Sequence, residues 1–132
     1  MPALQLDNQA SDFLGQDVLN HFVDGDYAPG SEAAFDVLDP ATAQPVARVA
    51  MASDGDVDQA VQAAHAAFGT WSAMTPNERS VLLHRLAERV DSELETIAQL
   101  ESLDVGKAIG AARFDVPFGG ECLRYFADLA TR

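Results

Sequence analysis

A helix-start signal at Thr75 is the feature that most constrains the fold of this chain. Threonine can cap a helix, Pro76 suits the first helical position, and Glu78 follows the threonine at the spacing of a capping box. Gly106 predicts where the helical stretch ends, and Asp91-Ser92 predicts a kink or a new start within it. Apolar residues at helical spacing define one stripe along this stretch: Leu83, Leu86, Val90, Leu94 and Ile97.

The residues before this helix carry strand and turn signals. Asp24-Gly25 predicts a tight hairpin turn, because this dipeptide tolerates positive φ angles. Asp39–Thr42 predicts a second turn, in which proline fixes φ and aspartate bonds to nearby backbone. The predicted strands are residues 21–23, 26–27, 35–38 and 46–50. Residues 1–19 have few periodic signals and are predicted to be a loose N-terminal arm.

Two more helices are predicted, one on each side of the central stretch. Ser53 predicts the N-cap of a helix that ends at Gly69, and Trp71 is predicted to fill the corner that follows. The last helix is predicted from about Val116, with Pro117 in its first turn. No stop signal follows its last apolar position, so we expect the chain to be cut rather than finished at its end.

Composition excludes several classes of partner. The chain has 132 residues and a formal net charge of −13, which argues against nucleic acids and anionic membrane surfaces. There is no secretory signal and no apolar run that approaches a membrane span, so a cytoplasmic location is expected. The one cysteine, Cys122, excludes an intrachain disulfide.

Individual reactive residues carry little signal by themselves. Cys122 is predicted to be a small packed hydrophobe, since its position inside a helix beside Glu121 disfavours a thiolate. Residues 54–58 lack the downstream glycine and glutamate of a calcium loop. Gly106-Lys107 lacks the other residues of a phosphate-binding loop, and the three histidines have no metal-ligand spacing.

Two stretches near the C-terminal end resemble motifs of the NAD(P)-dependent aldehyde dehydrogenases. They are ESLDVGK at residues 101–107 and CLRYFA at residues 122–127. The other stretches similar to that family are residues 21–27, 37–42, 56–61 and 63–68, Trp71, and residues 79–87. The resemblance covers residues 20–132 in register, so the chain looks like the first quarter of an aldehyde dehydrogenase.

The resemblance implies the α/β aldehyde dehydrogenase fold. This portion, residues 20–132, would be an incomplete N-terminal part of the cofactor-binding domain, mostly α-helical with a short β-hairpin and strand region. The implied reaction oxidises an aldehyde to a carboxylic acid with NAD or NADP, through a cysteine thiohemiacetal and thioester. The implied partners are the remainder of the subunit and the aldehyde, in a homodimer or homotetramer.

No catalytic or cofactor-binding residue is assigned in this chain. In the family that it resembles, the nucleophile, the base and the dinucleotide contacts all lie in later sequence. The 132-residue chain alone is therefore expected to be inactive. The alternative from the residues themselves is a free-standing, acidic, helical protein-interaction module without catalysis.

Two small sets of residues are carried over from the family. The first set matches positions that hold a monovalent cation in some members: the backbone carbonyls of Val37 and Leu38 and the side chain of Asp104. A hard cation prefers oxygen ligands of this kind. The alternative is that Asp104 only caps backbone near a helix end. Phe114 and Phe118 match positions that line the aldehyde tunnel, four residues apart and so on one helical face, unless Pro117 displaces Phe114. The alternative is that both are ordinary core residues.

Overall fold

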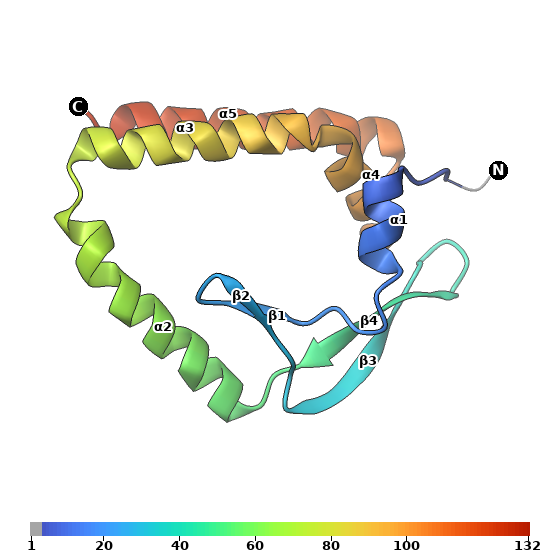
Figure 1. The fold of residues 1–132 in the computed structure, drawn as a ribbon. Coiled ribbons are helices and arrows are strands. Elements are labelled where there is room, and N and C mark those ends of the chain that lie inside the picture. The colour runs from blue at the N-terminus through green and yellow to red at the C-terminus, as the bar shows by residue number, and fades with distance from the viewer. Residues whose placement is uncertain (1–3) are drawn as a thin grey trace. The chain divides into compact units, whose positions relative to one another are not determined.

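The computed structural model describes residues 4–132, which form two compact units. One unit is Asp12–Ala73, and the other combines the described residues up to Ser11 with Met74–Arg132. Both units are drawn in Figure 1. Among the described residues, no helix has the length and apolar character needed to cross a membrane.

The first unit, Asp12–Ala73, contains two antiparallel hairpins and one long helix. Strands β1 (His21–Val23) and β2 (Asp26–Ala28) pair around Asp24 and Gly25, whose φ angles are 55° and 84°, as the Asp-Gly dipeptide predicted. Strands β3 (Glu32–Leu38) and β4 (Pro45–Met51) form the second hairpin, with Asp36 opposite Arg48. The predicted strands are therefore confirmed, each within a few residues of its ends.

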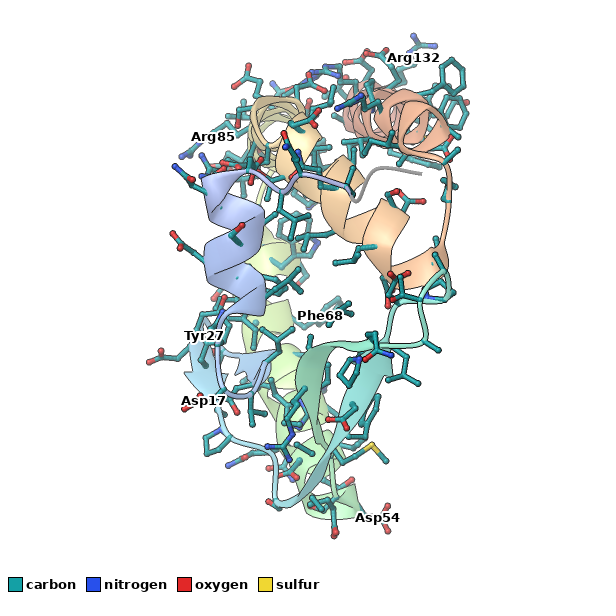
Figure 2. The ribbon with its side chains drawn as sticks, turned by 90° about the vertical axis from the view of Figure 1, so that its right-hand side faces the viewer. Asp17, Tyr27, Asp54, Phe68, Arg85 and Arg132 are labelled. Carbon is teal, nitrogen blue, oxygen red and sulfur yellow. The ribbon has the colours of Figure 1, made fainter. Side chains whose placement is uncertain are left out.

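Helix α2 (Asp54–Ala73) begins at the cap that the sequence predicted. The Ser53 hydroxyl accepts a hydrogen bond from the Asp56 backbone N–H at 3.2 Å, and the Asp56 carboxylate accepts one from the Ser53 backbone N–H at 2.8 Å. The same carboxylate binds Ser31 through its backbone N–H and its hydroxyl. These bonds hold the pKa of Asp56 well below its usual range, the Ser53 backbone bond contributing most. Asp54, labelled in Figure 2, lies in this first turn.

The second unit is a layer of helices, α3 (Pro76–Ser92), α4 (Leu94–Val105) and α5 (Ile109–Leu129). Thr75 and Glu78 form the predicted capping box at the start of α3, with both reciprocal hydrogen bonds present. The predicted break is confirmed at Glu93, between α3 and α4. Helices α3 and α5 run side by side, as Figure 1 shows.

Small residues form the centre of the second unit. Ala98 of α4 and Ala112 and Val116 of α5 are buried together. Partly buried apolar side chains surround them: Val90, Leu94, Ile97 and Ile109. Three of these, Val90, Leu94 and Ile97, belong to the apolar stripe that the sequence predicted, whereas Leu86 of that stripe is 49% exposed. The stripe is therefore confirmed as core only in part.

Two helix boundaries differ from the prediction. Helix α2 does not end at Gly69 but continues to Ala73, so Trp71 lies within the helix and is 41% exposed instead of filling a corner. Helix α5 begins at Ile109, well before Val116, and it contains Pro117 in its interior. Phe114 is consequently helical, and Pro117 does not displace it.

The N-terminal residues contain an element that the weak periodic signals did not predict. Helix α1 (Asn8–Leu14) follows Asp7, whose carboxylate accepts a hydrogen bond from the Ala10 backbone N–H at 2.7 Å. Asp7 also bonds to α4, through its backbone N–H to Gln99 at 2.6 Å and through its carboxylate to the Thr96 hydroxyl at 2.8 Å. The start of α1 is therefore fixed by residues about ninety positions away, which explains why no local pattern marks it.

Candidate functional site

The ESLDVGK motif forms the C-terminal end of α4 and the first two residues of the turn that leads to α5. Helix α4 ends at Val105, and Gly106 then adopts a φ of 71°, the left-handed conformation that favours glycine and that the sequence predicted as a stop. Only Gly106, Lys107 and Ala108 separate the two helices. The last two residues of the motif therefore belong to a tight helix–helix connection, whose geometry sets how α5 departs from α4.

Both the side-chain ammonium and the backbone carbonyl of Lys107 form hydrogen bonds. Its ammonium group donates hydrogen bonds to Glu101 on α4 and to Asp115 on α5, the latter at 2.5 Å. Its carbonyl oxygen accepts a hydrogen bond from the Ser102 hydroxyl at 2.6 Å. The bond to Asp115, followed by the bond to Glu101, raises the pKa of Lys107, so the lysine stays charged.

A second basic residue, Arg124, connects α3 and α5 within the CLRYFA motif. Its guanidinium donates to the carboxylate of Asp91 on α3 and to Glu121 at 3.0 Å. Gly120 lies directly beneath this pair, because a Cβ there would be 2.9 Å from the Asp91 carboxylate and 3.2 Å from the guanidinium. The absence of a side chain at Gly120 therefore leaves room for the ion pair.

A third ion pair connects α4 and α5 on the solvent side. The Arg113 guanidinium donates two hydrogen bonds to the Glu95 carboxylate, at 2.7 Å and 2.9 Å. These bonds are the main reason that the pKa of Glu95 falls to about 2, with Gln99 contributing a further bond. Sequence reasoning missed Glu95, whose only sequence signal is its place in the first turn of a helix.

The two predicted tunnel residues lie on the exposed side of α5. Phe114 is 74% exposed and Phe118 is 63% exposed, so neither ring is buried within this chain. Their spacing places them on one helical face, together with Tyr125 and Leu129, which are also exposed. This aromatic face lies opposite the buried residues of the helix: Ala112, Val116, Gly120 and Ala127.

Cys122 differs from its prediction. It is exposed instead of packed, because its position on α5 falls on the aromatic face and not on the face that contacts α3 and α4. Nothing in the described residues gives it the partners of a nucleophile. Its nearest charged neighbour in sequence, Glu121, bonds to Arg124.

The three predicted cation ligands lie in different units of the chain. Asp104 is exposed in the last turn of α4, while Val37 and Leu38 belong to β3. Within residues 4–132, no group of three or more histidine, cysteine or carboxylate side chains is arranged to hold a metal ion. The cation site therefore stays a prediction.

Comparison with known proteins assigns the class. The profile of the aldehyde dehydrogenase family matches residues 27–132. The chain belongs to the aldehyde dehydrogenase family. It corresponds to the N-terminal portion of these larger proteins and has their fold here, mostly helical after a short strand region.

Individual relatives give the extent of the match. The aldehyde dehydrogenase of Emericella nidulans is 39% identical over 116 residues, which are 86% of this chain and 23% of that protein. The human 2-aminomuconic semialdehyde dehydrogenase is 38% identical over 83% of this chain and 23% of its own length. The NAD+ complex of aldehyde dehydrogenase from Bacillus cereus superposes with a TM-score of 0.92 at 34% identity, over 97% of this chain and 27% of that one. The chain thus spans about a quarter of the length of these relatives.

Proposed function

We propose that this chain is the N-terminal portion of an enzyme that oxidises aldehydes to carboxylic acids with NAD(P)+. The observation that carries the proposal is the family match over residues 27–132, the stretch that contains both the ESLDVGK and the CLRYFA motif. The near-complete superposition on a dehydrogenase solved with NAD+ supports the choice of a nicotinamide acceptor. Discrimination between NAD and NADP is left to the remainder of the subunit.

The chemistry itself is assigned to the remainder of the subunit. Residues 4–132 contain no glycine-rich turn between a strand and a helix, the donor set that holds a pyrophosphate, so no dinucleotide contact is derived for them. Cys122, the one thiol, has neither a basic partner nor a helix N-terminus beside it. The 132-residue chain is accordingly proposed to be inactive alone.

This chain is proposed to contribute structure, together with residues that line the substrate site. Phe114 and Phe118 are proposed to form part of the aldehyde tunnel, because both rings are exposed on one face of α5 and neither takes part in the core of this chain. The chain is also proposed to contribute oxygen ligands to a monovalent cation, from the backbone carbonyls of Val37 and Leu38 and the carboxylate of Asp104. Residues 20–132 would form part of the cofactor-binding domain of a cytoplasmic homodimer or homotetramer.

A chimera tests the proposal. The stretch of the Bacillus cereus aldehyde dehydrogenase that matches this chain, 27% of that protein, is replaced by the present 132 residues. The chimera is expected to fold and to reduce NAD+ or NADP+ in the presence of an aldehyde, measured as nicotinamide absorbance. The matched control is the same dehydrogenase with the stretch deleted, which is expected to be inactive.

Two results would contradict the proposal. A chimera that folds and binds NAD+ but oxidises no aldehyde in a panel of aliphatic and aromatic substrates would favour the non-catalytic interaction module. Aldehyde-dependent NAD(P)+ reduction by the isolated chain would show that the chemistry does not depend on the rest of a subunit. Mass spectrometry of the purified sample excludes a contaminating dehydrogenase in that case.

A further inference from the structure

The starting point is the weak beginning of helix α5. Its N-cap residue is Ala108, which provides no side-chain hydrogen bond to the first turn. No acidic residue occupies that first turn either, so the helix dipole gains nothing there. The direction in which α5 leaves the turn must therefore be set by other contacts.

Lys107 provides those of the contacts that lie at the turn itself. Its ammonium reaches back to Glu101 on α4 and forward to Asp115, eight residues along, on α5. The Ser102 hydroxyl holds its carbonyl oxygen at 2.6 Å, which fixes the backbone between the two helices. The ammonium and both carboxylates are about a third to a half exposed, so water screens the attraction only partly.

Asp115 connects the hydrogen bonds of Lys107 to the aromatic face of α5. It directly follows Phe114 and precedes Phe118 by three residues, all within one continuous helix. A shift of Asp115 relative to α4 therefore carries both rings with it. Neutralising Lys107 would also leave the Glu101 and Asp115 carboxylates, which now share one ammonium, without their counter-charge.

We propose that Lys107 is a positioning residue for the aldehyde site. By fixing α5 against α4, Lys107 holds in place the wall that Phe114 and Phe118 form on the aromatic face. This inference deepens the proposed function and rests on it for the identity of the substrate. In this proposal Lys107 does not act by contact with the substrate or the cofactor. It acts through Asp115 and the helix that carries the two rings.

The first experiment measures substrate kinetics in the Bacillus cereus chimera. Lys107→Met is expected to raise KM for benzaldehyde by roughly two- to fivefold, because a displaced wall contacts a ring less well. The KM for acetaldehyde, which reaches little of the wall, and kcat are expected to change less. Lys107→Arg keeps the charge and should restore most of the benzaldehyde KM.

The matched control is Arg113→Met. Arg113 also joins α4 and α5 by an ion pair, to Glu95, but it does not contact the connecting turn. If the control raises the benzaldehyde KM as much as Lys107→Met, the effect is general helix loosening and the proposal is wrong. An unchanged KM in Lys107→Met overturns it as well.

The second experiment needs no enzyme activity and uses the 132-residue chain. Hydrogen exchange measured by mass spectrometry should show roughly two- to fivefold faster exchange in residues 108–116 for Lys107→Met than for Arg113→Met. Equal exchange in the two variants, or fast exchange of this segment already in the unsubstituted chain, overturns the proposal. If the unsubstituted chimera proves inactive, the proposed function fails, and the exchange experiment decides on Lys107 separately.

Discussion

Adjacent glycines on α5 offer the sharpest test of how the helices pack. Gly119 has open space where a Cβ would be added, with no atom within 4 Å. At Gly120, the added Cβ would lie 2.9 Å from the Asp91 carboxylate oxygen and 3.2 Å from an Arg124 nitrogen. The same substitution, glycine to alanine, should therefore stabilise the chain at Gly119 but not at Gly120, although the two positions are consecutive in one helix.

The magnitudes follow from the two environments. Alanine is favoured over glycine inside a helix by about 1 kcal/mol, so Gly119→Ala should stabilise the chain by that amount and raise Tm by roughly 4 °C. Gly120→Ala gains the same propensity but must displace the Asp91–Arg124 pair, whose side chains are 42% and 28% exposed. Losing a partly exposed pair and forcing a rotamer costs about 1–2 kcal/mol, so the net change is between zero and about 1 kcal/mol of destabilisation.

Urea unfolding followed by circular dichroism measures both variants. The informative comparison is Gly120→Ala in an Asp91→Ala background, in which the obstructing carboxylate is absent. There the substitution should regain its full stabilisation of about 1 kcal/mol. Equal stabilisation by Gly119→Ala and Gly120→Ala in the unsubstituted background would refute the close packing of α3 on α5.

Three further predictions concern other elements. Thr75→Ala removes one half of the α3 capping box and should cost about 1 kcal/mol in urea unfolding. The pKa of Glu95 in the folded chain is about 2, below its usual 4.5, so the ionised carboxylate stabilises the fold above pH 4.5, and this stabilisation is lost as the pH falls toward 2. In Glu95→Gln, Tm should therefore depend less on pH between 4.5 and 2. Gly30→Ala would drive a Cβ into the Met51 carbonyl oxygen and should destabilise the fold by over about 2 kcal/mol, measured as faster hydrogen exchange in β4. The control is Gly69→Ala, whose Cβ meets nothing within 4 Å and should not destabilise the fold.

Most elements could be predicted from the sequence because their signals are local. The Asp24-Gly25 hairpin, the Ser53 and Thr75 caps and the left-handed Gly106 each depend on a few neighbouring residues. The apolar stripe also predicted part of the core-facing side, since Val90, Leu94 and Ile97 contact the core, but Leu86 of the same stripe is exposed. The predicted break near Asp91-Ser92 was likewise confirmed.

The errors arose where contacts distant in sequence decide the structure. Pro117 was interpreted as a helix start, since an interior proline loses a hydrogen bond and costs about 3 kcal/mol. In the structure, Ala112 and Val116 pack into the core around it, and Lys107 and Arg113 attach the preceding turns to α4. Tertiary contacts thus outweigh the local cost. Helix α1 was missed for the same reason, because its cap, Asp7, is fixed by α4.

The site residues were only partly predictable. Spacing alone placed Phe114 and Phe118 on one helical face, but it could not show that this face points away from the core of the chain. The contacts of Lys107 were not predictable either, since Glu101 and Asp115 become its partners only once the turn between α4 and α5 has formed. A motif identifies a family before it explains what each of its residues does.

Helix α5 distributes its apolar residues in an unusual way, and this supports an assembled dehydrogenase. The face that packs against α3 and α4 is made of small residues, whereas the opposite face exposes large ones: Phe114, Phe118, Tyr125 and Leu129. A helix that borders water usually has charged residues on its outer side, and one that is apolar on both sides is normally buried between two layers. Helix α2 repeats the pattern, since none of its residues is buried although Val57, Val61 and Phe68 are apolar. Contiguous exposed apolar faces of this kind are typical of surfaces that contact another part of a protein, which agrees with the proposal that this chain is part of a larger subunit.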